Sequence, residues 1–143
     1  MRIVGLVQAR MGSSRIPGKV LEPIGGRPMV LRIAERVARS PRVGAVAIVT
    51  STEPSDDALV AYAERQGLPW FRGPVDDIVT RLHGATAGLS ADVSIRVWGD
   101  CPFVDPEVLD RGLNTLIDDG FDFVTNAALG RRTYPPGLDF EVY

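Results

Sequence analysis

Residues 3–19 read Ile-Val-Gly-Leu-Val followed directly by Gln-Ala-Arg-Met-Gly-Ser-Ser-Arg-Ile-Pro-Gly-Lys, which ends at Lys19. The first five residues predict a short buried strand. The stretch from Gln8 to Lys19 suits a loop around phosphates, because its glycines let the backbone approach, its hydroxyls donate and its cations neutralise charge. A solvated basic turn has the same composition. The position of the loop at the carboxyl end of a strand favours binding, since open α/β sheets bind ligands there.

Two well-known phosphate-binding motifs do not fit this loop. A P-loop has four residues between its first glycine and Gly-Lys, followed by Ser or Thr. Here five residues separate Gly12 from Gly18, Pro17 lies among them, and Val20 follows Lys19. The sequence also lacks the Gly-x-Gly-x-x-Gly turn of dinucleotide-binding proteins. A kinase or an NAD enzyme is therefore not favoured.

Composition limits the class of protein. A chain of 143 residues, 45% hydrophobic and 24% charged, is typical of one globular domain. The net charge of −2 argues against a general nucleic-acid surface, so we expect no nucleic-acid partner. The single cysteine, Cys101, is typical of a reducing compartment. We find no signal peptide or membrane span and expect a cytoplasmic protein without a membrane partner.

Alternating strands and helices predict the fold class. The expected strands cover residues 3–7, 43–50, 68–71, 91–98, 121–125 and 138–142. Four helices are expected, two of which cover residues 28–40 and 75–89. A third helix begins at the cap Ser55, has Asp56 and Asp57 in its first turn and ends at Gly67. The fourth begins at the cap Asp105 and ends at Gly120. This order predicts a doubly wound, mostly parallel sheet with helices on both faces.

The chain resembles the cytidylyltransferases that activate acidic sugars, the CMP-sialic-acid and CMP-KDO synthetases, and most of all their SpsF-like spore-coat-polysaccharide branch. The loop from Gln8 to Lys19 carries the resemblance, and four further motifs follow in order. They are Thr50-Ser51-Thr52, Phe71-Arg72-Gly73, Gly99-Asp100-Cys101-Pro102 and the segment from Tyr134 to Val142. The resemblance implies a Rossmann-like, GT-A-type fold and transfer of CMP from CTP to a sugar, with release of pyrophosphate.

The resemblance also implies how residues 1–143 fit into a protein. We expect them to be a nucleotidyltransferase domain, the N-terminal part of a longer chain, because similar proteins continue with further strands and helices. A full-length protein of this kind is expected to be a homodimer. Its partners would be CTP and a sugar that is expected to be acidic, for surface or spore-coat polysaccharide.

The candidate nucleotide-binding residues lie mainly in the first loop. The resemblance implies phosphate contacts from Arg10 and Lys19, and a cytosine contact from Arg72. An ordinary surface arginine is the alternative for Arg72. The full predicted set is Gln8, Ala9, Arg10, Gly12, Ser13, Ser14, Arg15, Lys19 and Arg72.

Two carboxylates are candidate ligands of Mg²⁺. Asp100 follows a predicted central strand, and a carboxylate there suits a hard ion that also binds substrate phosphates. The alternative is that Asp100 caps a turn. Asp139 is the second candidate, or else a solvent-facing strand residue on the same face as Glu141. Together with Arg10 and Lys19, Asp100 completes the predicted catalytic set.

Two other functions remain open at this stage. One is a different sugar-nucleotide pyrophosphorylase on the same fold, although such enzymes usually open with Ala-Gly-Gly-x-Gly-Thr-Arg-Leu. The other is a nucleotide-binding or assembly module without turnover. Trp98 also departs from the glutamine or threonine that related enzymes often carry before Gly-Asp, which implies different base or sugar contacts there.

Overall fold

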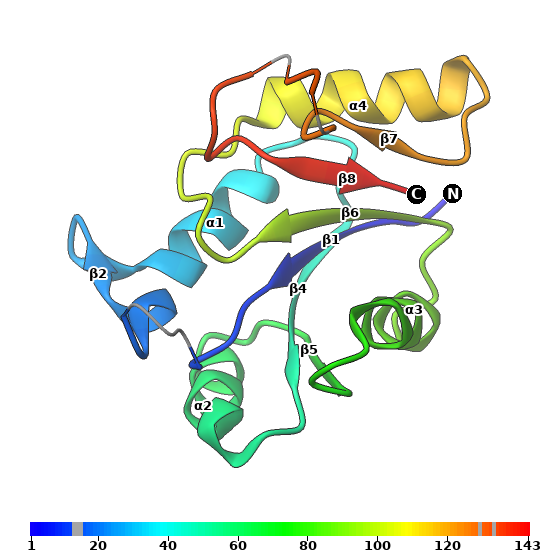
Figure 1. The fold of residues 1–143 in the computed structure, drawn as a ribbon. Coiled ribbons are helices and arrows are strands. Elements are labelled where there is room, and N and C mark those ends of the chain that lie inside the picture. Colours follow the sequence, from blue (N-terminus) through cyan, green and yellow to red (C-terminus); the bar gives the residue numbers. More distant parts are fainter. Residues whose placement is uncertain (13–15, 129, 133) are drawn as a thin grey trace.

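The central sheet has six strands in the order β5-β4-β1-β6-β8-β7 (Figure 1). The computed structural model describes residues 1–12, 16–128, 130–132 and 134–143. Strands β4, β5 and β6 all run parallel to β1, whereas β8 is antiparallel to both β6 and β7. The strands are β1 (Ile3–Gln8), β4 (Ala45–Ser51), β5 (Trp70–Gly73), β6 (Val93–Trp98), β7 (Val124–Thr125) and β8 (Phe140–Val142).

Helices cover both faces of this sheet. The helices are α1 (Met29–Val37), α2 (Asp57–Arg65), α3 (Ile78–Gly88) and α4 (Pro106–Asp118). Buried residues of α1, α2 and α4 belong to one core cluster, while those of α3 belong to a second cluster with β1 and β4. The predicted fold class is confirmed. No helix among the described residues is long and apolar enough to span a membrane.

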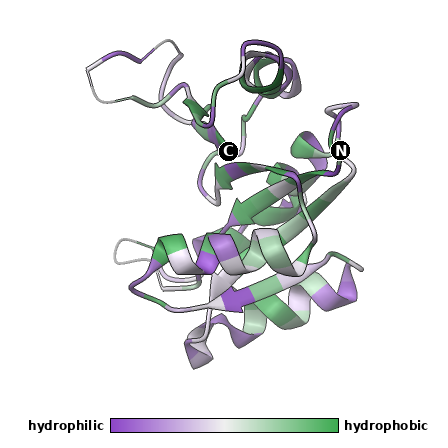
Figure 2. Ribbon diagram, turned by 90° about the vertical axis from the view of Figure 1, so that its right-hand side faces the viewer, coloured by the Kyte–Doolittle hydropathy of each residue, from purple (hydrophilic) through white to green (hydrophobic). Residues whose placement is uncertain are grey.

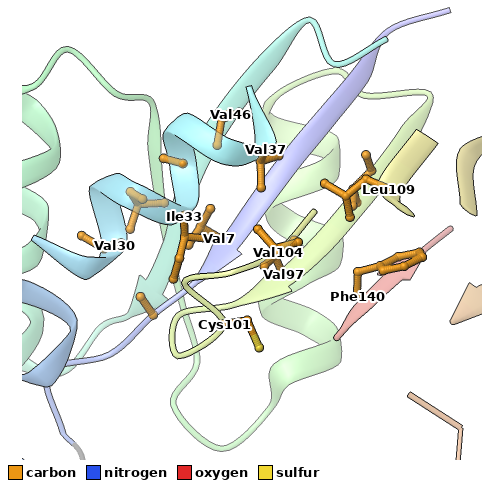
Figure 3. Packing of buried hydrophobic residues seen from close by; sticks show 14 of the residues in the cluster. Val7, Val30, Ile33, Val37, Val46, Val97, Cys101, Val104, Leu109 and Phe140 are labelled. Carbon is orange, nitrogen blue, oxygen red and sulfur yellow. The ribbon is translucent and has the colours of Figure 1, made fainter. Parts of the chain in front are cut away.

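The larger core cluster lies between the sheet and the helices α1 and α4 (Figure 3). Val7 of β1 and Val97 of β6 point into it, whereas Val4 and Leu6 point to the α3 side. Because β1 is buried on both faces, its sequence is a continuous apolar run. Colouring by hydropathy shows mostly apolar central strands and helices along which apolar and polar residues alternate (Figure 2).

The cap expected at Ser55 is wrong. Residues Pro54–Asp56 form a 3-10 turn, η2, and α2 begins at Asp57. Asp56 is fully buried and does not lie in an exposed first turn. Ser55 is exposed in the middle of η2 and makes no cap.

A second difference is a short hairpin that the pattern of apolar residues did not reveal. Strands β2 (Pro23–Ile24) and β3 (Arg27–Pro28) pair antiparallel around Gly25 and Gly26. Both glycines have positive φ, 57° and 79°, which is the conformation of a two-residue hairpin turn. The Gly-Gly pair was therefore the available signal. The strand expected at residues 121–125 is also shorter and consists of Val124–Thr125 only.

Candidate functional site

The carboxyl ends of β1 and β6 bring the first loop to Asp100. Gln8 and Trp98 are in register at the ends of these two neighbouring parallel strands. In Figure 1 the arrowheads of both strands point to one edge of the sheet. There the Lys19 Nζ lies 3.1 Å from the Asp100 Oδ2, although 81 residues separate them in sequence. The side chain of Lys19 is 25% exposed and that of Asp100 49%, so a ligand can reach both charges.

Met11 forms the neck of the first loop. Its carbonyl oxygen accepts a hydrogen bond from the Gly18 N–H at 2.9 Å. Its own N–H donates to the Asp56 Oδ1 at 2.7 Å. Gly18 has a φ of 73°, a conformation that favours glycine, and places Lys19 at the start of the 3-10 turn η1 (Lys19–Leu21). The hydrogen bond from Gly18 to Met11 therefore closes the loop, and the hydrogen bond from Met11 to Asp56 attaches the closed end to η2.

Asp56 supports this neck from a fully buried position. Its Oδ2 accepts hydrogen bonds from the Ser51 N–H at 3.1 Å and from the Ser51 hydroxyl. Burial raises the pKa of the Asp56 carboxyl, but the hydrogen bonds from Ser51 and Met11 outweigh burial and hold that pKa below its usual value. Asp56 is therefore ionised at neutral pH.

Arg10 lies between this carboxylate and another guanidinium. The Arg10 Nε is 3.9 Å from the Asp56 Oδ2 and, among the described residues, has no hydrogen-bond partner. Burial, followed by repulsion from Arg10, lowers the pKa of Arg81, a buried residue of α3. Two guanidiniums thus share the surroundings of one carboxylate, an arrangement that an anion would stabilise.

Asp139 and Asp100 lie at the facing ends of two paired antiparallel strands, because Phe140 of β8 pairs with Val97 of β6. Burial raises the pKa of the Cys101 thiol, and the negative charges of Asp100 and Asp139 raise it further. The Asp139 carboxylate also pairs with Arg132 through two hydrogen bonds of 2.7 and 3.1 Å. The two residues thus lie at the same edge of the sheet. The described residues contain no group of three or more potential metal ligands.

Arg72 braces the loop that follows β4. Its Nε donates to the Ser51 carbonyl and its Nη2 to the Glu53 carbonyl, both at 2.8 Å. Its Nη1 pairs with the Asp57 carboxylate at 2.6 Å. A guanidinium has five N–H donors, so these three bonds leave two for another acceptor. The contact of Arg72 with cytosine stays a prediction.

The other predicted residues of the loop differ in what they offer a ligand. The Gln8 side-chain oxygen accepts a hydrogen bond from the Arg96 Nε at 2.8 Å. Ala9 is buried in the core and donates its N–H to Val49, so it has no free donor for a phosphate. Gly12 is exposed. The predicted contacts of Ser13, Ser14 and Arg15 lie outside the described residues.

Sequence reasoning missed three polar residues beside this edge of the sheet. They are Asp56, Arg81 and Arg96. Arg96 pairs with Glu141 at 2.7 Å and stacks on the Trp98 ring, 4.5 Å from its centroid. The only available signal for Asp56 was its place just after a strand of the parallel sheet, because acids in a first helical turn are common. Burial of an arginine gives no signal in the sequence.

Gly99 allows β1 and β6 to approach just before Asp100. A Cβ at Gly99 would lie 2.9 Å from the Gln8 carbonyl oxygen and 2.8 Å from the Ala9 Cβ. We therefore expect Gly99→Ala to reduce the free energy of unfolding by roughly 1–3 kcal/mol and to displace Asp100. Thermal denaturation measures the first effect. Gly44→Ala is the matched control, since its Cβ would meet the Ile3 carbonyl at an ordinary 3.6 Å. Equal melting temperatures for the two variants would contradict the packing at Gly99.

Comparison with known proteins identifies the family of the chain. A family model described as cytidylyltransferase matches residues 4–133. The chain belongs to the cytidylyltransferase family.

Two relatives illustrate how far the similarity extends. The chain is 38% identical over 134 residues to the spore coat polysaccharide biosynthesis protein SpsF of Bacillus subtilis, covering 90% of this chain and 56% of that protein. It is 35% identical over 127 residues to a 3-deoxy-manno-octulosonate cytidylyltransferase of Neisseria meningitidis, covering 87% and 49%. The chain thus spans about half the length of these curated relatives.

Solved structures share the fold. A cytidylyltransferase from Leptospira borgpetersenii superposes with a TM-score of 0.90 at 32% identity, over 100% of this chain and 60% of that one. A CMP:2-keto-3-deoxy-manno-octonic acid synthetase complexed with CTP gives 0.73 at 29% identity, over 87% and 52%. The resemblance drawn from the sequence is confirmed by these findings.

Proposed function

We propose that this chain is the CTP-binding domain of an enzyme that transfers CMP from CTP to a sugar and releases pyrophosphate. The observation that carries the proposal is the contact between Lys19 and Asp100 at the carboxyl edge of the sheet. In the free protein each charge neutralises the other. A bound nucleotide would offer Lys19 a phosphate, while Asp100 would be released toward a cation. Phosphoryl-type transfer requires such positioning and charge neutralisation more than covalent chemistry from the protein.

A divalent ion, which we propose to be Mg²⁺, fits the residues at this edge. Mg²⁺ is bound by one or two carboxylates together with substrate phosphates and water. Asp100 is half exposed, and Asp139 lies at the same edge of the sheet. Arg132 would have to give up part of its pairing with Asp139 for that carboxylate to bind an ion. When bound, the ion would offset negative charge on the triphosphate; Lys19 and Arg10 would contact its phosphates.

The proposed cytosine contact rests on the structure, and the proposed acceptor sugar rests on a similar enzyme. Two N–H donors of Arg72 remain for the carbonyl of a cytosine, and Arg72 lies at the carboxyl end of β5, beside β4. The proposed acceptor is an acidic sugar, because the similar Neisseria enzyme is named for 3-deoxy-manno-octulosonate. The homodimer and the cytoplasmic location expected from the sequence stay predictions.

We expect CTP with Mg²⁺ to stabilise the chain more than UTP, GTP or ATP does. A ligand at about 100 times its dissociation constant adds ~2.7 kcal/mol to the free energy of unfolding. Thermal denaturation with each nucleotide measures the effect, and Mg²⁺ alone provides the baseline. Equal shifts for all four triphosphates would contradict the cytidine assignment and leave triphosphate binding in place. No shift with any of them would contradict the proposed function as a whole.

A further inference from the structure

The neck of the first loop depends on a residue outside that loop. Met11 is tied on one side to Gly18, within the loop, and on the other to Asp56, 45 residues away in η2. The remaining oxygen of the Asp56 carboxylate accepts from the backbone N–H and the hydroxyl of Ser51, the last residue of β4. One carboxylate therefore joins the loop after β1 to the end of the neighbouring strand.

We propose that Asp56 is a positioning residue that holds the first loop and Arg10 in the geometry that receives the triphosphate. This proposal rests on the proposed function. It does not give Asp56 a contact with the nucleotide, because its side chain is fully buried. Asp56 acts through Met11, whose backbone sets the start of the loop, and through Arg10, whose Nε faces the same carboxylate at 3.9 Å.

The hydrogen bonds explain why a carboxylate is needed at this position. Both oxygens of an ionised carboxylate accept hydrogen bonds, and here each faces an N–H group, of Met11 on one side and of Ser51 on the other. An asparagine offers one oxygen and one NH₂ group, so one of the two N–H groups would face a donor. Asp56→Asn thus keeps the size of the side chain but can preserve only one side of the link.

The charge of Asp56 has a separate effect on Arg10. Arg10 and Arg81 repel each other, and the Asp56 carboxylate is the acid that favours the charged form of the nearby Arg81. Without that charge, Arg10 would lose its nearest acid while the repulsion remained. Arg10 would then be expected to turn away from Arg81, toward solvent. Its position for a phosphate would no longer be fixed before binding, which weakens binding.

The test compares Asp56→Asn with Asp105→Asn, with wild type as reference. Asp105 is a matched control, because its carboxylate also accepts two backbone N–H bonds, from Glu107 and Val108, at the start of α4. Isothermal titration calorimetry with CTP and Mg²⁺, and separately with inorganic pyrophosphate, measures binding. Hydrogen exchange of the Met11 amide, followed by NMR, reports directly on the link.

We expect Asp56→Asn to weaken binding of CTP and of pyrophosphate by about tenfold to a hundredfold, the usual range for a lost hydrogen bond to a charged group. The Met11 amide should exchange faster in this variant, while Asp105→Asn should match wild type in both measurements. Normal binding and a protected Met11 amide in Asp56→Asn would overturn the proposal. Equal weakening in both variants would also overturn it, since that result indicates general destabilisation.

A second variant covers the case in which Asp56→Asn does not fold. Ser51→Ala removes one donor to the carboxylate and leaves the Met11 bond, so we expect a smaller loss of affinity and partial deprotection of Met11. If Ser51→Ala kept wild-type affinity and wild-type protection of the Met11 amide, or if this amide exchanged fast in wild type, the proposal would be contradicted. The pyrophosphate titration tests the role of Asp56 independently of the proposed function. If wild type bound pyrophosphate but preferred no nucleotide, the cytidine assignment would be contradicted, and the comparison of Asp56→Asn with wild type would still test the positioning role.

Discussion

Asp100→Asn is expected to remove the effect of Mg²⁺ on CTP binding and to lower pyrophosphate release to below about a hundredth of the wild-type rate. The substitution keeps the size of the side chain and removes its charge. A metal ion stabilises developing charge by several kcal/mol, and loss of one well-placed group typically reduces turnover by roughly 10²- to 10³-fold. Binding is measured by calorimetry with and without Mg²⁺, and release with acidic sugars as acceptors.

The sign of the binding change distinguishes a metal ligand from a structural residue. Without Mg²⁺ the Asp100 carboxylate repels the triphosphate and also engages Lys19 at 3.1 Å. Asp100→Asn should therefore bind free CTP at least as tightly as wild type, and should bind it more weakly only when Mg²⁺ is present. A residue that merely shaped the turn would affect both measurements in the same direction, and such a result would contradict the metal role.

Stability and a second carboxylate provide the controls for Asp100. The side chain is half exposed, and substitutions at exposed positions usually change the free energy of unfolding by less than ~0.5 kcal/mol. The melting temperature of Asp100→Asn should therefore stay close to that of wild type. Asp139→Asn should reduce the Mg²⁺ effect less completely, because Asp139 is already neutralised by Arg132. If Mg²⁺ affected CTP binding in Asp139→Asn as it does in wild type, Asp100 would be the single carboxylate ligand of the proposed site.

The elements of the fold could be predicted because their signals are local. The valine-rich strands and the helical face formed by Val30, Ile33 and Val37 are visible in the sequence, and these three residues are buried. The capping of α4 by Asp105 is equally local, since its carboxylate accepts hydrogen bonds two and three residues ahead. Because parallel strands that follow one another end at one edge of the sheet, the sequence also predicts that the first loop lies near Asp100.

The support of the site could not be predicted because it depends on contacts between distant segments. Asp56 and Asp57 are adjacent acids with the same local environment in the sequence. Only the packing of η2 against the end of β4 buries the first and leaves the second exposed beside Arg72. Similarly, nothing local distinguishes Arg81, which is buried, from the exposed Arg65. Buried polar residues of this kind are determined by tertiary hydrogen bonds.

Lys19→Ala and Arg10→Ala are each expected to weaken CTP binding by about tenfold to a hundredfold, the usual range for a charged hydrogen bond. The two variants should differ in stability. Lys19 loses only a partly exposed ion pair, worth about 0.2–1 kcal/mol at most sites of this kind. The Arg10 Nε, in contrast, is buried beside Asp56. Arg10→Ala should therefore cost more stability than Lys19→Ala.

Arg65→Ala is the matched control for both variants. It removes the same charge from the last turn of α2, where Arg65 is exposed and lies over the Tyr62 ring. If long-range electrostatics alone attracted the triphosphate, all three variants would weaken binding similarly, and the effect would vanish at high salt. If Lys19 and Arg10 contact the phosphates, their losses persist in salt while Arg65→Ala binds CTP normally. Normal CTP binding by Lys19→Ala would favour the alternative interpretation of the loop as a solvated basic turn. The ion pair between Lys19 and Asp100 would then have only a structural role.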